Sequence, residues 1–234
     1  MKKFVKVALA AVMAVSVLGV SSTSVMAKKS NKEVITVGIS PDYKPYESLN
    51  KKNKMVGFDI DMVKWFGKYL SKEEGKKVTF RFKQMDFDNI VTQLQGDQVD
   101  LGISGFTYSE DRKVEWSEPY LGSSQVAVVP NGSDITSVDQ LEGKSLVAQT
   151  GATGEKAAKD VKDAQVTGLK NVQDIMNALS ANQYDAAVVD SGVAKQYAQS
   201  GQFTTLDGSL LDEKNYIIAK EGNKEMIDKV NKAI

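Results

Sequence analysis

One stretch decides the fold, Asp100-Leu-Gly-Ile-Ser-Gly-Phe-Thr-Tyr-Ser-Glu-Asp-Arg112. Its first residues continue a short apolar run, Val99–Ile103, which predicts a buried strand. The run ends at Ser104 and Gly105, two small residues that let a backbone come close to another group. We therefore expect a buried strand whose end can be approached closely.

The residues beyond this strand suit a carboxylate. Thr107 offers a hydroxyl, and Arg112 offers a planar guanidinium that pairs with two oxygens at once. Backbone amides near Ser104 and Gly105 add further donors. The alternative is a loop whose Arg112 makes a surface ion pair, as most arginines do. The stretch alone favours that alternative, so the rest of the chain has to decide.

Strands and helices alternate before this stretch. Apolar residues three and four positions apart predict a helix, and alternating ones predict a strand. The order is a strand at 34–39, a helix at 57–70, a strand at 77–82 and a helix at 87–95 capped by Asp86. This order is typical of a mostly parallel sheet with crossover helices, an α/β fold.

The pattern restarts after a valine-rich strand at 125–130, which we interpret as leaving a first lobe. Ser137 and Gln140 fit a capping box over a short helix. The remaining elements are a strand at 145–148, a helix opened by the loop 149–154, a helix capped by Asn171, a strand at 185–189, a helix from Asp190, a strand at 216–219 and a helix at 223–234. The length suits one large domain or two lobes of about 100 residues each.

The two halves echo each other. Leu94-Gln-Gly-Asp-Gln-Val-Asp100 aligns with Leu179-Ser-Ala-Asn-Gln-Tyr-Asp185, with Leu, Gln and Asp in step. Each copy predicts a helix end, a tight turn and a strand. Ligands on open parallel sheets bind beyond the carboxyl ends of the strands. That end carries Ser104 and Gly105 in one half and Asp190 in the other.

The polar residues at these two ends fit one ligand type. The loop at Thr153 opens a helix, so its amides and the helix dipole favour an anion beside Arg112. Asp190 suits an ammonium, and Tyr43 and Phe87 can pack on an aliphatic stem. A free α-amino acid carries both charges on one carbon. The alternatives are that Asp190 is only a helix cap, and that Tyr43 and its neighbour Tyr46 only cover the core.

Several kinds of chemistry are excluded. The chain has no His and no Cys, so it lacks the usual zinc and copper ligands and the Ser-His and Cys-His nucleophile pairs. We assign no catalytic residue, metal site or cofactor. Gly143-Lys-Ser145 lacks the earlier glycine of a phosphate loop. Asp59 and Asp61 are interpreted as residues of a helix start.

The N-terminus predicts export. Three lysines precede an apolar segment of about a dozen residues and a small-residue site ending at Ala27, as in a cleaved signal peptide at 1–27. Cleavage leaves 207 residues in which 27 basic residues face 30 acidic ones. A mildly acidic chain is not expected to bind nucleic acid. We expect an extracytoplasmic monomer without a lipid-anchor Cys.

The motifs resemble a known family. Gly57-Phe-Asp-Ile-Asp-Met62 is similar to the signature of polar amino-acid-binding proteins of ABC importers, the bacterial extracellular solute-binding protein family 3. The segments at 100–112, 151–153 and 184–190 are similar to three further family motifs. The resemblance implies a two-lobed, periplasmic-binding-protein-like fold of type II with a hinge of two crossing strands. It implies lobe I at 28–125 plus 215–234 and lobe II at 126–214.

The resemblance also implies roles for the site residues. Arg112, Thr107 and Thr153 would hold the α-carboxylate of a free amino acid. Asp190, with backbone groups at Ser104 or Gly105, would hold the α-ammonium, and Tyr43 and Phe87 would stack on the ligand. Closure of the lobes would present the amino acid to a membrane permease.

The sequence departs from the family pattern at three points. Ser40 stands where many members have an acid, and Asp42 is displaced from that position, which leaves the side-chain preference open and mildly disfavours a strongly cationic ligand. Glutamine or another neutral polar amino acid is the expected ligand. The lipid-anchor Cys of Gram-positive members is missing, and the family usually continues beyond the last helix. The alternatives to a receptor are an enzyme on the same fold, similar to cyclohexadienyl dehydratase, and a stand-alone amino-acid-sensing domain.

Overall fold

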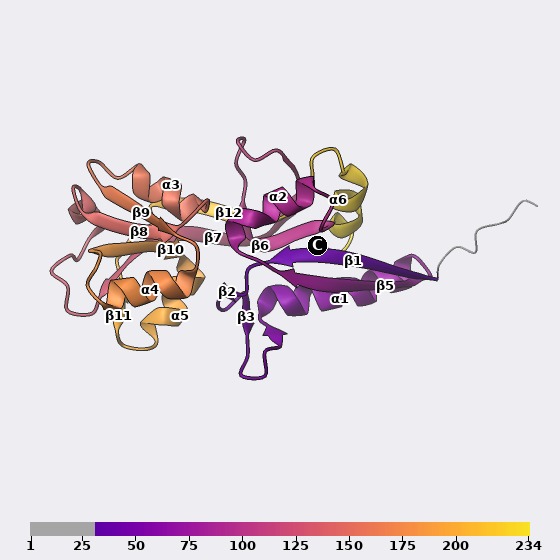
Figure 1. Ribbon diagram of the computed structural model, residues 1–234, viewed down its shortest axis with the longest axis horizontal. Coiled ribbons are helices and arrows are strands. Elements are labelled where there is room, and N and C mark those ends of the chain that lie inside the picture. The colour runs from indigo at the N-terminus through magenta and orange to yellow at the C-terminus, as the bar shows by residue number, and fades with distance from the viewer. Residues whose placement is uncertain (1–30) are drawn as a thin grey trace, which may run out of the picture. The chain divides into compact units, whose positions relative to one another are not determined.

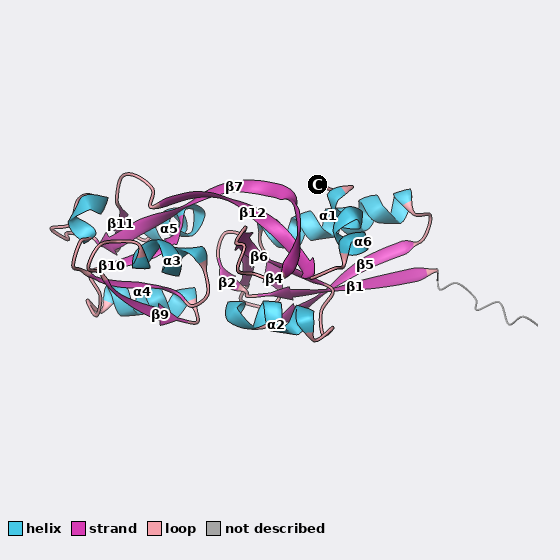
Figure 2. Ribbon diagram, turned by 90° about the horizontal axis from the view of Figure 1, so that it is seen from above, coloured by secondary structure: helices cyan, strands magenta, loops and turns pink. Residues whose placement is uncertain are grey.

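Two long strands, β7 (Val114–Pro130) and β12 (Leu211–Lys220), organise the chain in the computed structural model, which describes residues 31–234. They pair antiparallel from Leu211 opposite Gln125 to Lys220 opposite Val114. Figure 2 shows both strands running from one group of elements into the other. They are the two crossing strands of the two-lobed, type II periplasmic-binding fold that the sequence predicts.

Lobe I is a sheet with helices on it (Figure 1). Its strands lie in the order β5 (Lys77–Gln84), β1 (Lys32–Ile39), β6 (Leu101–Thr107) and β12, with β1 parallel to both β5 and β6. Its helical segments are α1 (Phe58–Glu73), the short 3₁₀ turn η1 (Phe87–Asn89), α2 (Ile90–Gln95) and α6 (Lys224–Asn231). Apolar residues of α1 and α6 pack on β1, β5, β6 and β12 in one core.

Lobe II repeats this plan. Its strands lie in the order β7, β10 (Ala186–Asp190), β8 (Ser145–Gln149) and β9 (Gln165–Leu169), and β11 (Phe203–Thr205) pairs with β7. Its helical segments are η2 (Val138–Leu141), α3 (Thr153–Lys159), α4 (Val172–Ser180) and α5 (Ser191–Ala198). β8, β9 and β10 are parallel, so their carboxyl ends lie at one edge.

The sequence motif that is repeated in the two halves has the same local structure in both copies. Asp97 and Asn182 follow α2 and α4, and their φ angles are 55° and 54°. In each copy the amide of the next residue, Gln98 or Gln183, bonds back to a carbonyl of the helix, at 2.9 and 3.0 Å. Asp and Asn are the residues, after glycine, that adopt this left-handed conformation most readily. The same helix stop therefore leads into β6 in one lobe and β10 in the other.

Four features differ from the sequence expectations. Asp86 lies at the N-cap position of η1 but its side chain makes no capping bond, and the segment 87–95 begins as a 3₁₀ turn. The loop after β1 contains a small antiparallel sheet, β2 (Asp42–Tyr43), β3 (Glu47–Leu49) and β4 (Met55–Val56). β9 and β11 were not expected, and β7 is a single strand of 17 residues.

The predicted signal peptide at 1–27 lies outside the described residues. Within 31–234, every helix is too short or too polar to cross a membrane.

Candidate functional site

Seven of the eight residues predicted for the site lie around one small cavity between the lobes. Six come from lobe I and Thr153 comes from lobe II; Gln125, Gln149 and Ala152 complete the wall, next to Tyr43, Phe87, Ser104, Gly105, Thr107, Arg112 and Thr153. The free space is about 10 Å³, room for roughly one water. An amino acid is larger, so the lobes have to separate to admit one.

Arg112 joins the two lobes. Its Nη1 donates to the carbonyl of Thr107 at 3.0 Å, and its Nη2 donates to the carbonyl of Gly151 in lobe II at 2.6 Å. Its guanidinium carbon lies 5.6 Å from the ring centre of Phe87 and 5.3 Å from that of Phe106. Burial lowers the pKa of Arg112, and the negative charge of Glu213 opposes that shift. Arginine remains charged at neutral pH, so a cation faces the cavity.

Two hydroxyls stand beside this cation. The Thr107 hydroxyl is buried and has no hydrogen-bond partner in the described chain. The Thr153 hydroxyl, at the start of α3, donates to Glu213 Oε2 at 2.7 Å. A buried hydroxyl without a partner costs about 1–3 kcal/mol. The Thr107 hydroxyl is therefore a donor that a ligand in the cavity would satisfy.

Gly105 forms part of the wall of the small cavity. Its φ is +63°, and a Cβ there would lie 3.1 Å from a ring carbon of Tyr43. Both the backbone conformation and the close aromatic ring favour glycine at this position. Asn215 of β12 lies next to Gly105 and has no exposed surface. Neither the oxygen nor the nitrogen of its side-chain amide is hydrogen-bonded in the described chain.

Asp190 does not line the cavity. It ends β10, is 1% exposed, and caps α5 by accepting from the amide of Gly192 at 2.9 Å. It also accepts from the hydroxyls of Tyr46 at 2.9 Å and of Ser123. Burial raises the pKa of Asp190, and these hydrogen bonds oppose the shift. The capping role is thus present, and the carboxylate also binds Tyr46 of lobe I.

The two tyrosines of the loop after β1 have different surroundings. Tyr43 lines the cavity, whereas Tyr46 is 8% exposed and packs in the core of lobe II. Phe87 stacks on Phe106 with ring centres 4.7 Å apart. Tyr43 and Phe87 therefore form the aromatic part of the cavity wall. Tyr46 instead connects lobe I to lobe II.

A buried pair of acids lies behind Ser104, which lines the small cavity. Ser104 Oγ donates to Glu47 Oε1 at 2.6 Å and accepts from the amide of Ser40 at 3.2 Å. Glu47 faces Asp59, both carboxyls are fully buried, and Glu47 Oε2 and Asp59 Oδ1 have no hydrogen-bond donor among the described residues. Burial raises the pKa of Glu47 well above its usual value and that of Asp59 to about 6. Two carboxyls in contact hold one proton between them.

Sequence reasoning missed four polar residues of the cleft: Gln125, Gln149, Glu213 and Asn215. Glu213 accepts from Gln125 at 2.6 Å as well as from Thr153. Residues 212–215 of β12 are all polar, so no period in the sequence separates Glu213 and Asn215 from their neighbours. A continuous polar run is also typical of a solvent-facing segment.

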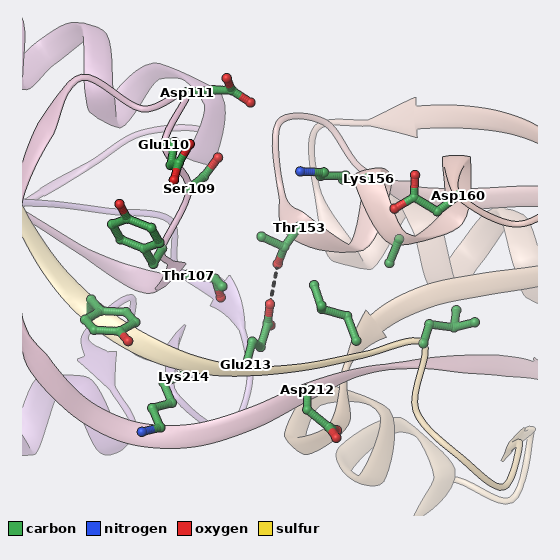
Figure 3. Close-up of a pocket in the computed structure, with 15 residues that line it drawn as sticks. Thr107, Ser109, Glu110, Asp111, Thr153, Lys156, Asp160, Asp212, Glu213 and Lys214 are labelled. Atoms are coloured by element: carbon green, nitrogen blue, oxygen red, sulfur yellow. Dashed lines mark hydrogen bonds between the residues drawn. The ribbon is translucent and has the colours of Figure 1, made fainter.

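A wider cavity of about 690 Å³ adjoins the small one, and Thr107 and Thr153 line both. Figure 3 shows Glu213 pointing toward Thr153, while Asp212 and Lys214 on the same strand point the other way.

Comparison with known proteins identifies a family that shares this sequence. The sequence model of the bacterial extracellular solute-binding proteins, family 3, matches residues 35–234. The arginine-binding extracellular protein ArtP of Bacillus subtilis (strain 168) is 29% identical over 242 residues, covering 100% of this chain and 92% of the relative. The glutamine-binding protein GlnH of the same organism is 26% identical over 253 residues, covering 100% and 92%.

A solved structure gives the same result. The crystal structure of the substrate-binding protein of an amino acid ABC transporter superposes with a TM-score of 0.78 at 33% identity, covering 86% of this chain and 91% of that one.

Proposed function

The chain belongs to the bacterial extracellular solute-binding proteins of family 3, and we propose that it captures a free polar amino acid between its lobes and delivers it to the permease of an ABC importer. It acts as a receptor without a chemical step. The relatives named above are binding proteins of this kind, although they differ in the amino acid that their names give.

One observation carries the proposal. A half-buried cation, Arg112, and a buried hydroxyl without a partner in the described chain, Thr107, face one cavity at the interface between the lobes. The two hydrogen bonds of Arg112 leave further N–H groups of its guanidinium free to bind a carboxylate. Thr153 adds a hydroxyl and lies at the first turn of α3. These donors suit an α-carboxylate.

We assign the α-ammonium to Asp190. Its carboxylate is held in place by the amide of Gly192 in lobe II and by the hydroxyl of Ser123 on the connecting strand β7. Its third donor, Tyr46, belongs to lobe I. Separation of the lobes removes Tyr46, and an ammonium then takes over that side of the carboxylate. Ser104 and Gly105 would supply backbone acceptors.

Binding and release require a hinge. We propose that β7 and β12 flex where they pass between the lobes, with lobe I at 28–125 plus 215–234 and lobe II at 126–214. Besides the packing of Tyr46 in the core of lobe II, individual hydrogen bonds join the lobes, and these include Arg112 to Gly151, Tyr46 to Asp190 and Val172 to Asp42. Such an interface can open at a modest cost. We also propose that the signal peptide at 1–27 directs export and that the exported protein is a monomer.

A thermal-shift screen tests this function. The protein is heated with each common L-amino acid and with the matching decarboxylated amines. We expect at least one amino acid to raise the melting temperature and its amine to have no effect, because the amine lacks the group that Arg112 binds. No shift with any amino acid, or equal shifts with amino acid and amine, would reject the assignment.

A further inference from the structure

Glu213 is a carboxylate that the proposed function does not use. It lies on β12, where the strand passes between the lobes, and its two oxygens accept from Thr153 and from Gln125. Both donors are neutral. Among residues 31–234, none of the ion pairs within 4.0 Å involves Glu213. Its charge acts on Arg112 and on Tyr43, both of which line the small cavity.

The charges of the cleft do not balance. Arg112 is the one charged residue among those described that line the small cavity. Three carboxylates lie near Arg112, those of Glu213, Asp190 and Asp42. Asp42 takes its hydrogen bonds from the neutral groups Ser40, Gln149 and Val172.

The nearby lysines do not correct this imbalance. Lys170 at the rim lies 3.6 Å from Asp86 and 3.8 Å from Asp88, so its charge is already matched. Lys156 and Lys214 line the wider cavity, but both are exposed, and solvent screens an exposed charge.

A zwitterion leaves the imbalance in place. Its carboxylate would neutralise Arg112 and its ammonium would neutralise Asp190, so Glu213 and Asp42 remain uncompensated. A ligand with a further positive charge reduces this excess, whereas a neutral or acidic side chain does not. Interaction between charges is stronger in a closed, water-poor cleft than at an exposed surface. The side chain of the ligand is therefore selected by charge.

We infer that Glu213 sets the charge selectivity of the cleft, so that the protein prefers an amino acid with a cationic side chain to its neutral isostere. The inference rests on the proposed function and names its substrate class. It revises the expectation drawn from Ser40, because β12 supplies an acid that the loop after β1 lacks at that position. The wider cavity beside Thr107 and Thr153 gives a long side chain space next to Glu213.

L-Arginine and L-citrulline test the inference, because they differ only in the charged end of the side chain. Calorimetry measures the affinity of the wild-type protein for both, then of Glu213→Gln and Asp212→Asn. Glutamine retains an acceptor for Thr153 and removes the charge. Asp212 also lines the wider cavity, but it is exposed, bonds Ser209 and points away from Thr153 in Figure 3, so solvent screens its charge and it is the matched control.

We expect the wild-type protein to prefer arginine by about tenfold or more, since one cancelled charge in a partly buried site is worth at least that factor. Glu213→Gln should lose most of this preference and Asp212→Asn should keep it. The ratio of the two affinities cancels effects that act on both ligands alike, such as altered closure.

Two results would overturn the inference and leave the proposed function standing. One is an unchanged arginine-to-citrulline ratio in Glu213→Gln. The other is a wild-type protein that binds neutral or acidic amino acids but neither arginine nor lysine. Failure to bind any amino acid in the screen would instead reject the proposed function, and this inference with it.

Discussion

The hydroxyl of Tyr46 donates to Asp190 Oδ1 at 2.9 Å, joining the loop after β1 in lobe I to the end of β10 in lobe II. Both residues are buried, at 8% and 1% exposure. Burial and the charge of Asp190 raise the pKa of Tyr46, so the phenol stays protonated and keeps donating at neutral pH. The contact is close, because a Cβ on Gly192 would lie 2.2 Å from the Tyr46 oxygen.

Tyr46→Phe removes this bond and leaves the ring. Because a hydrogen bond to a charged acceptor contributes about 1.5–3 kcal/mol, we expect the free energy of unfolding to fall by about that amount. Urea denaturation measures it. Tyr197→Phe is the control, since the Tyr197 hydroxyl makes an exposed bond of 3.2 Å to Gln173, and the change there should stay within about 0.5 kcal/mol. Equal effects of both substitutions would contradict the role of Tyr46.

The buried pair of Glu47 and Asp59 should make stability depend on pH. The raised pKa values mean that the folded protein holds protons which the unfolded chain has already released. For Asp59 this pH window runs from the ordinary pKa of 3.8 to the raised pKa of about 6. For Glu47 the pH window begins at the ordinary pKa of 4.5 and extends upward. The folded state binds more protons there, so the free energy of unfolding falls as pH rises.

Glu47→Gln tests this dependence, because glutamine imitates the protonated carboxyl at every pH. We expect the variant to gain stability relative to the wild-type protein as pH rises through the window, measured as melting temperature against pH. Asp61→Asn is the control, since Asp61 is exposed and pairs with Lys64 at 2.9 Å. Parallel curves for the wild-type protein and Glu47→Gln would show that the pair does not share a proton.

Gly102 marks a tight place in the core of lobe I. A Cβ there would lie 2.8 Å from side-chain carbons of both Ile218 and Ile90. Gly102→Ala should therefore lower the free energy of unfolding by about 1–3 kcal/mol, the usual cost of overpacking. Gly122→Ala on β7 has no atom within 4 Å of the new carbon and serves as the control. Chemical denaturation that shows equal stability for both variants would contradict this packing.

The hinge predicts a change of size on binding. Because a bound amino acid adds contacts to both lobes, it should shift an equilibrium between open and closed molecules toward the closed form. The radius of gyration from X-ray scattering should therefore fall when a bound amino acid is added to saturation. The decarboxylated amine provides the control and should leave the scattering curve unchanged. Identical curves with and without the amino acid would argue against opening at β7 and β12.

Regular elements with a clear period were predictable from the sequence. β1, α1, β5 and the strands ending at Thr107 and Asp190 follow from apolar spacing, and the caps predicted at Asn171 and Asp190 are present. The strands β2, β4 and β11 have two or three residues, too few for a period to show. Asp86 fails as a cap because the chain enters a 3₁₀ turn there.

The site was predictable only where a strand end supplied the residues. Ser104, Gly105 and Thr107 lie at the end of β6, and Arg112 and Thr153 lie in the segments that follow strands, so their convergence follows from topology. Glu213 and Asn215 come from the middle of β12. A strand that crosses a cleft buries polar side chains which, in sequence, are indistinguishable from an exposed face. The contact of Tyr46 with Asp190 required the relative placement of two lobes.

The central claim is that Arg112 receives the carboxylate of a free amino acid, and calorimetry on Arg112→Ala tests it most directly. Arg81→Ala is the matched control, because Arg81 is exposed on β5. With the amino acid identified by the thermal-shift screen, we predict a loss of affinity of about thirtyfold or more for Arg112→Ala, with wild-type affinity for Arg81→Ala. A folded Arg112→Ala protein that binds as tightly as the wild-type protein would contradict the account.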